Sequence, residues 1–218
     1  MEILEVMKSR HSVRQYTDKK IESDKRSVLN ELALECNSES GMNIQIIYDE
    51  PKCFDSFMAH YGKFSGCKNY IAVVGKKGKD LDEKAGYYGE KLVLKAQELG
   101  LNTCWVAMTH GKSAAKIKKG EKLAIIISLG YGENQGVAHK SKQLSDVCSQ
   151  TDGLPAWFAE GMEAVMLAPT AMNQQKFKFT LNGDQVKAIA TGGFYSKIDL
   201  GIVKYHFEAV SGHKVNLT

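Results

Sequence analysis

The sequence predicts a mixed α/β or α+β protein rather than a helical bundle. Segments with helical periodicity alternate along the chain with short apolar runs that end at glycine, lysine or proline. At 218 residues, the chain is long enough for one well-buried domain or for two small halves that share a core. With 43% apolar and 25% charged residues, its composition is typical of a soluble globular protein.

The first elements are helices on either side of a basic segment. Apolar side chains share one face in a helix predicted over residues 2–9, and a second amphipathic helix is predicted over 24–35. Polar and apolar side chains then alternate over 43–48 until Pro51, which predicts a strand. Residues 53–61 can form a short helix.

The middle of the chain predicts a sheet and its longest helix. Residues 70–75, 102–107 and 123–129 are apolar runs typical of buried strands, and both parallel and antiparallel order remain open. Between the first two lies a helix predicted over 87–99, with Gly100 placed where a C-cap glycine ends a helix.

Lysines and other polar residues mark the connections. Lys116, Lys118 and Lys119 follow an amphipathic segment, where cations suit a helix C-terminus. Residues 133–153 are polar and lack periodicity, so they predict a long crossing connection of the kind that is often functional.

The last third predicts a helix over 157–167, a strand over 176–181 that ends in a turn at 182–184, and a helix over 199–210. Two of its features repeat earlier ones in the same order. A Met-Asn-x-Gln segment precedes an alternating strand at Met42 and again at Met172, and helices run from glycine to glycine over eleven residues from Gly89 and from Gly201. These matches favour an internal duplication with halves 1–150 and 151–218 in one compact unit.

Charge and cysteine content narrow the functional classes. The net charge of +4, without a block of five like charges, favours an anionic small ligand about as much as nucleic acid. The five cysteines form no CxxC pair, so the sequence predicts neither disulfides nor a zinc site, and a reduced, cytoplasmic compartment follows as the default. No apolar run approaches the length of a membrane span, and no signal peptide is recognised.

Two basic clusters are candidate anion sites. Arg10 and Arg14 flank His11 and Ser12, and a pair of guanidinium groups with a hydroxyl between them matches phosphate oxygens. A second basic group, at 139–142, could complete the binding of a doubly charged phosphate. A solvated basic surface is the alternative for each cluster.

Taken together, several motifs resemble the FMN-dependent nitroreductase family. They are the Arg10-His11-Ser12-x-Arg14 cluster, the turn from Ala168 to Gln175 (Ala-Pro-Thr-Ala-x-Asn-x-Gln), the unit from Gly89 to Val106, and Leu129-Gly130-Tyr131-Gly132 followed by a basic group. The resemblance implies an α+β, nitroreductase-like fold with a mixed or antiparallel sheet flanked by helices. It further implies FMN bound between two subunits and ping-pong reduction of nitroaromatics, quinones or similar acceptors by NADH or NADPH.

The chain departs from that pattern in the position of the turn. In ordinary members the Pro-Ser/Thr-x-x-Asn turn follows the first long helix; here that place holds Ser40-Gly41-Met42-Asn43, and the fuller match comes at Ala168. The chain looks closest to a variant group with this arrangement. One chain would then supply both sides of a pseudo-dimeric site, and the pattern is compatible with a monomer and with a homodimer. Gln175-Lys176-Phe177 replaces the usual Gln-Pro-Trp.

The resemblance assigns roles to individual residues. Phosphate charge would be neutralised by Arg10, Arg14, His139, Lys140 and Lys142, with donors from His11 and Ser12. The flavin ring would lie against Pro169, Thr170 and Ala171, with Asn173 at its polar edge and Val106, Ala107 and Met108 on the opposite side. No catalytic protein acid is required, because the hydride chemistry belongs to the flavin.

Other classes are less well supported. No metal-ligand spacing, Gly-x-Ser-x-Gly motif or P-loop is present. A non-catalytic flavin-binding or flavin-storage protein is the main alternative to an oxidoreductase that acts on a small-molecule acceptor. A basic RNA- or nucleotide-binding module is the third; the preferred interpretation involves neither nucleic acid nor a membrane.

Overall fold

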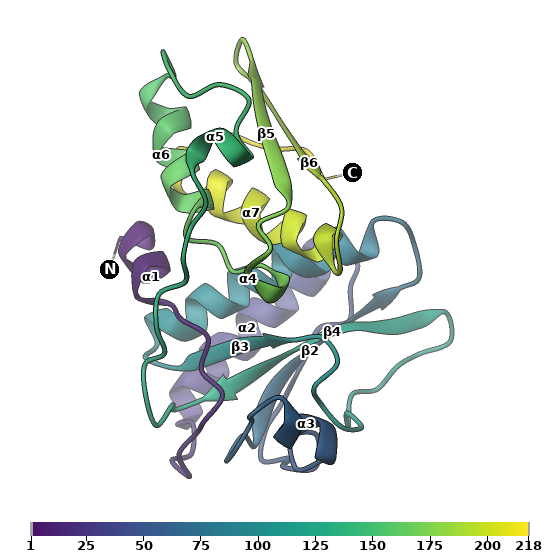
Figure 1. Cartoon of the computed structure of the whole chain (residues 1–218). Coiled ribbons are helices and arrows are strands. Elements are labelled where there is room, and N and C mark those ends of the chain that lie inside the picture. Colours follow the sequence, from purple (N-terminus) through teal and green to yellow (C-terminus); the bar gives the residue numbers. More distant parts are fainter. Residues whose placement is uncertain (1, 218) are drawn as a thin grey trace. The chain divides into compact units, whose positions relative to one another are not determined.

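The computed structural model describes residues 2–217, which divide into two compact units that are interleaved along the chain (Figure 1). The sheet unit contains residues 9–81 and 92–137, and the hairpin unit contains residues 2–8, 82–91 and 138–217. Helix α4 (Leu81–Glu98) contributes its first half to the hairpin unit and its second half to the sheet unit. Division into duplicated halves at residue 150 stays a prediction, because packing into units does not reveal how the chain arose.

The sheet unit is built on four antiparallel strands in the order β1-β2-β4-β3. The strands are β1 (Gln45–Ile47), β2 (Asn69–Lys76), β3 (Asn102–Val106) and β4 (Glu121–Gly130). All three pairings are antiparallel, with a register shift between Val73 and Val74 where β2 meets β4. The predicted α+β class is therefore confirmed, and the sheet is antiparallel rather than mixed.

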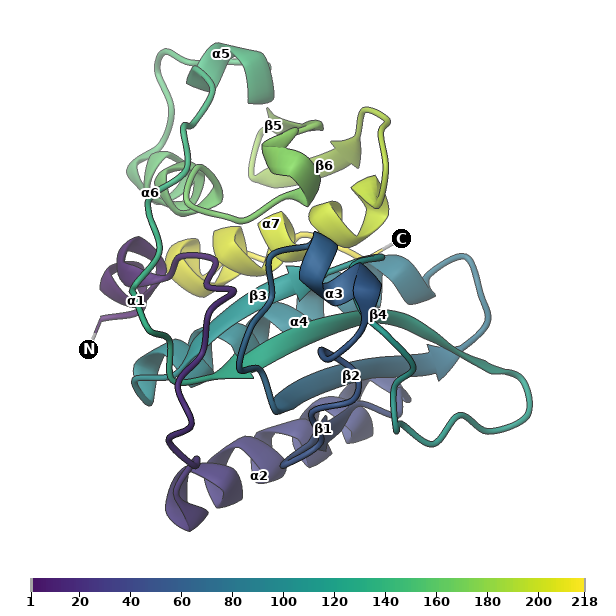
Figure 2. The same ribbon diagram turned by 60° about the horizontal axis from the view of Figure 1, so that its bottom comes forward.

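Helices cover both faces of this sheet. Figure 2 shows α2 (Ser23–Ser40) and α3 (Phe57–Tyr61) on opposite sides. Alternate residues of β2, Tyr70, Ala72 and Val74, belong to the core cluster on the side of α3, as strand geometry requires. Every residue of β2 except Lys76 is buried, as predicted for a strand covered on both faces.

The hairpin unit packs helices around a two-stranded hairpin. Its helices are α1 (Ile3–Ser9), α5 (Leu144–Val147), α6 (Ala156–Val165) and α7 (Ser196–Ser211), with the single 3₁₀ turn η1 (Ala171–Asn173). The hairpin consists of β5 (Phe177–Asn182) and β6 (Gln185–Ala190). α6 lies against α7, where Gly161 faces the Phe207 ring.

Two glycines allow α4 and α7 to approach closely within the hairpin unit. A Cβ on Gly86 would lie 1.9 Å from the carbonyl oxygen of Ile198, and one on Gly201 would lie 1.9 Å from that of Glu83. Only glycine permits backbone contact of this kind. The crossing fixes where α7 begins relative to α4.

Three segments differ from the sequence-based expectation. The lysines at 116–119 lie in an irregular loop, because the preceding residues turn along the sheet edge instead of forming a helix. The polar connection at 133–153 contains the short helix α5, held by a capping box between Gln143 and Asp146. β6 was not predicted, since its alternation is weak; it forms because a two-residue turn places it beside β5.

The five cysteines are buried free thiols. No helix within residues 2–217 has both the length and the apolar character needed to cross a membrane.

Candidate functional site

The N-terminal basic segment runs beside β3 in the sheet unit. Ser12 pairs with Thr103 in a parallel bridge, and the Val13 N–H donates to the Thr103 carbonyl oxygen at 3.0 Å. The Tyr16 hydroxyl donates to the Val13 carbonyl oxygen at 2.8 Å and lies 2.7 Å from Ser128 Oγ. These bonds fix the backbone from which the two arginines project.

Arg10, Ser12 and Arg14 lie in the neighbourhood of the Cys104 thiol. Burial raises the pKa of Cys104, whereas Arg14, a hydrogen bond from Ser12 and Arg10 lower it. Arg10 is 4% exposed and Arg14 is exposed, so the cluster has one buried and one solvent-facing guanidinium.

His11 contacts the loop that follows β4. Its Nδ1 lies 3.2 Å from the carbonyl oxygen of Gln135. Gly136 has φ +67°, and a Cβ there would lie 2.8 Å from both the Cβ of His11 and the carbonyl oxygen of Ser12. Close packing of this loop against the basic segment therefore requires glycine.

The predicted segment Val106–Met108 lies at the other end of β3. Val106 is buried and pairs with Ile126 of β4, while Met108 is 69% exposed in the following loop. The sheet unit thus holds seven of the predicted site residues, four beside the start of β3 and three at its end.

The other predicted site residues lie in the hairpin unit, three of them in the 139–142 segment and four on a turn with unusual backbone geometry. Met172 and Asn173 both have φ 52°, and Gln175 has φ 44°. Residues other than glycine rarely adopt this left-handed region, and each such residue costs on the order of 1 kcal/mol or more unless its surroundings hold it. We call residues 168–175 the strained turn.

The second basic group is bound directly to the strained turn. Lys140 supplies a carbonyl oxygen that accepts from Asn173 Nδ2 and from Gln175 Nε2, both at 2.9 Å. Lys142 donates its backbone N–H to Gln175 Oε1 at 2.9 Å and its ammonium to the Gln175 carbonyl oxygen at 3.1 Å. His139 Nε2 lies 3.1 Å from the Met166 carbonyl oxygen. The structure therefore brings these two predicted groups together.

Both polar atoms of the Asn173 amide are engaged, one of them within the turn. Besides the bond from Nδ2, its Oδ1 accepts from Gln175 Nε2 at 2.9 Å. The Thr170 hydroxyl accepts from the Gln175 N–H at 3.0 Å. Pro169, Thr170 and Ala171 are half-buried, so they leave part of the turn accessible.

Comparable contacts occur around the earlier Asn-x-Gln in the sheet unit. Asn43 Nδ2 and Gln45 Nε2 donate to the carbonyl oxygen of Lys116, at 3.2 and 2.8 Å, and the Lys116 N–H donates to Gln45 Oε1 at 2.9 Å. In each unit an asparagine and a glutamine thus bind one lysine carbonyl, and the glutamine oxygen accepts an N–H from the same loop.

Sequence reasoning missed Asp199, which binds the strained turn from the first turn of α7. Its Oδ1 accepts from the Ala171 N–H at 2.9 Å and its Oδ2 from Gln174 Nε2 at 2.7 Å. Burial raises the pKa of Asp199 to about 6, and the hydrogen bonds from Gln174 and Ala171 lower it. An acidic residue in a first helical turn is common, so the sequence contained no signal for this role.

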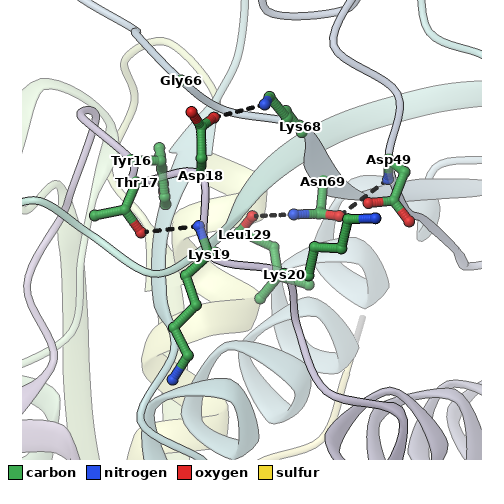
Figure 3. A pocket seen from close by; sticks show the side chains of 11 residues that line it. Tyr16, Thr17, Asp18, Lys19, Lys20, Asp49, Gly66, Lys68, Asn69 and Leu129 are labelled. Carbon is green, nitrogen blue, oxygen red and sulfur yellow. Dashed lines mark hydrogen bonds and ion pairs between the residues drawn. The ribbon is translucent and has the colours of Figure 1, made fainter.

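A small pocket elsewhere in the sheet unit contains none of the predicted site residues. Its volume is about 50 Å³, and its lining includes Asp18 and Lys68, whose ion pair spans 2.5 Å (Figure 3). Asn69 Oδ1 accepts from the Asp49 N–H at 3.0 Å, so several polar groups of the lining bind one another. Space of this size suits water rather than a cofactor. Residues 2–217 contain no cluster of three or more side chains able to hold a metal ion.

A protein-family model described as "Putative TM nitroreductase" matches residues 2–211, nearly the whole chain. The chain belongs to this nitroreductase family. This result confirms the resemblance inferred from the motifs. No curated protein matches the chain.

Solved structures confirm the nitroreductase fold. A nitroreductase from Thermotoga maritima shares 23% identity with a TM-score of 0.73, covering 96% of this chain and 83% of that one. A nitroreductase from Desulfovibrio desulfuricans, solved in complex with FMN, shares 19% identity with a TM-score of 0.53, covering 67% and 94%. A protein from Parabacteroides distasonis titled as a putative NADH dehydrogenase or NAD(P)H nitroreductase shares 18% identity with a TM-score of 0.54, covering 71% and 99%.

Proposed function

We propose that this protein is an FMN-dependent oxidoreductase that takes reducing equivalents from NADH or NADPH and passes them to nitroaromatics, quinones or similar acceptors. Membership of the nitroreductase family and the FMN in the Desulfovibrio desulfuricans structure support the cofactor. Bound FMN supplies the hydride chemistry, so no protein acid or nucleophile is required.

The observation that carries this proposal is the placement of Arg10, Ser12 and Arg14 in one short segment beside the start of β3, in the neighbourhood of the Cys104 thiol. Two guanidinium groups and a hydroxyl form a donor set that fits a phosphate dianion. His11, held at Gln135, belongs to the same segment. The role of this chain's residues is thus to neutralise the phosphate and anchor one end of the cofactor.

The strained turn is proposed to orient the flavin ring. Pro169, Thr170 and Ala171 are small and partly accessible, so a planar ring can lie close to their backbone. Asn173 Oδ1 has a second lone pair beyond its bond to Gln175 and can accept from the ring edge.

The remaining assigned residues complete the proposal. Lys142 keeps two ammonium N–H groups beyond its bond to Gln175, and with His139 and Lys140 it adds positive charge. Val106, Ala107 and Met108 are assigned to the other side of the ring, and the site is formed by a pseudo-dimeric monomer or by a homodimer.

Steady-state kinetics test the proposal. Protein reconstituted with FMN should oxidise NADPH or NADH only when a quinone or nitroaromatic is present, and double-reciprocal plots should be parallel, as in a ping-pong reaction. Flavin-free protein is the control. FMN binding without any turnover would support a flavin-storage protein instead, and failure to bind FMN would contradict the proposal as a whole.

A further inference from the structure

The strained turn is held from two sides, and only one side depends on a carboxylate. On one side Gln175 binds the 140–142 segment through amide contacts and through the Lys142 ammonium, which donates to its carbonyl oxygen. On the other side the Asp199 carboxylate accepts from the Ala171 N–H and from the Gln174 side chain. Asp199 is 2% exposed, so water does not compete for these bonds.

Both groups that contact the Asp199 carboxyl are N–H donors, so the protonation state of Asp199 determines how well it can bind them. A carboxylate can accept from both, whereas a protonated carboxyl turns one oxygen into a donor that faces another donor. Gln174 cannot easily reverse its amide, because its Nε2 also donates to the Phe194 carbonyl oxygen at 2.7 Å. Protonation of Asp199 therefore weakens its hold on the strained turn, because the neutral carboxyl is a poorer acceptor for both N–H groups.

We propose that Asp199 is a positioning residue that holds the strained turn in its cofactor-binding conformation only while it is ionised, so that acidification releases the turn. This inference rests on the proposed function for its link to FMN. The left-handed residues at 172, 173 and 175 make release favourable, because their backbone relaxes once the restraint is lost.

The neighbouring ionisable groups are engaged elsewhere. On α4, Glu83 pairs with Lys204 and the Tyr87 hydroxyl donates to Glu208. Tyr195 supplies the carbonyl oxygen that accepts the Asp199 N–H, and Lys176 and Lys197, the lysines nearest in sequence to the strained turn and to the start of α7, are exposed. Burial is the largest cause of the raised pKa of Asp199, about 6, which places the transition in mildly acidic solution.

Hydrogen exchange of the Ala171 amide, measured by NMR on flavin-free protein and corrected for intrinsic exchange, tests the restraint directly. Protection should fall as pH is lowered from 7 to 5, with a midpoint near 6. Asp199→Asn should give low protection that does not change with pH. Asp184→Asn, at the exposed hairpin turn, is the matched control and should behave as wild type. Circular dichroism checks that each variant is folded.

FMN affinity, measured by flavin fluorescence over the same pH range, tests the link to the cofactor. At pH 5 only about one tenth of Asp199 is ionised, so affinity should fall about tenfold more in wild type than in Asp199→Asn, where only the FMN phosphate itself titrates. Protection of Ala171 that is unchanged with pH, or equal in Asp199→Asn and wild type, would overturn the proposal. So would FMN affinity that falls equally in both. Absence of FMN binding at any pH would refute the proposed function, while the exchange data would still show whether Asp199 holds the turn.

Discussion

Asp199 is a buried polar side chain that holds the strained turn. Burial of its charged carboxylate lowers the stability of the folded protein at neutral pH. In the unfolded chain its carboxyl titrates near the ordinary value of 3.8, whereas in the fold burial raises its pKa to about 6. Folding therefore favours the protonated form. Its contribution to stability is fully present below about pH 3.8 and is lost as pH rises through 6.

Asp199→Asn should consequently make the protein more stable at neutral pH. Two pKa units correspond to roughly 2–3 kcal/mol, so the free energy of unfolding at pH 7 should rise by about that amount, with little change at pH 4. Urea denaturation at the two pH values measures the difference, with Asp184→Asn as the control. A variant less stable than wild type at pH 7 would show that the two hydrogen bonds outweigh the burial of the charge.

Arg10 and Arg14 define the second prediction at the residue scale. If they bind the phosphate, wild type should prefer FMN to riboflavin, which lacks that group. In the double variant Arg10→Ala/Arg14→Ala, FMN affinity should fall by about a hundredfold or more, because charge-assisted hydrogen bonds contribute roughly 1.5–3 kcal/mol each. Riboflavin affinity should hardly change.

Lys77→Ala/Lys119→Ala is the matched control, since it removes two exposed charges from loops of the same unit. Equal losses for FMN and riboflavin in the arginine variant would mean that these arginines support the fold and do not bind the phosphate. Isothermal titration calorimetry with both ligands provides the comparison.

At the scale of elements, the two Asn-x-Gln segments allow a matched experiment. Gln175→Ala and Gln45→Ala each remove a side chain that binds a lysine-bearing loop through the same kinds of bond. Each should lower the free energy of unfolding by about 1–2 kcal/mol. Only Gln175→Ala should also weaken FMN binding. If Gln45→Ala weakened FMN binding as much as Gln175→Ala, the strained turn would have no particular role in binding FMN.

The crossing of α4 and α7 is the second prediction at this scale. A methyl group on residue 201 would lie 1.9 Å from the Glu83 carbonyl oxygen, so Gly201→Ala must separate the helices. We expect a loss of about 3 kcal/mol or more in thermal or urea denaturation. Lys197→Ala, on the exposed surface of α7, should have little effect. A fully stable Gly201→Ala protein would show that the helices can shift apart at little cost.

Periodicity predicted most of these elements because it reports burial. The strands β2, β3 and β4 and the helices α2, α4, α6 and α7 were all anticipated, with ends displaced by a few residues. β6 was not predicted, because apolar and polar side chains alternate only weakly along it. Its formation depends on pairing with β5. The similar contacts of Asn43 and Asn173 support the predicted duplication, which remains a prediction.

The site was less predictable than the fold. Motifs identified the arginine cluster and the Pro169 turn, because those residue types are informative by themselves. The contacts of Lys142 with Gln175 and of Asp199 with Ala171 join residues about thirty positions apart. No local pattern encodes such pairs, since they depend on how the hairpin unit folds.

At the scale of the whole molecule, the chain is a nitroreductase-family protein with candidate site residues in each of two units. The family match establishes the fold class.

A ligand that binds the folded state should also stabilise the whole protein. FMN at a hundred times its dissociation constant should add about 2.7 kcal/mol to the free energy of unfolding. Thermal unfolding with FMN and with riboflavin at equal concentration measures this effect. A melting temperature unchanged by FMN would count against a specific site.

Anaerobic reduction of the FMN-loaded protein tests the central claim most directly. Addition of NADPH or NADH should bleach the visible flavin absorption, and a quinone or nitroaromatic added next should restore it without oxygen. Flavin absorption that persists in the presence of both reductants would contradict the claim that this protein is an oxidoreductase.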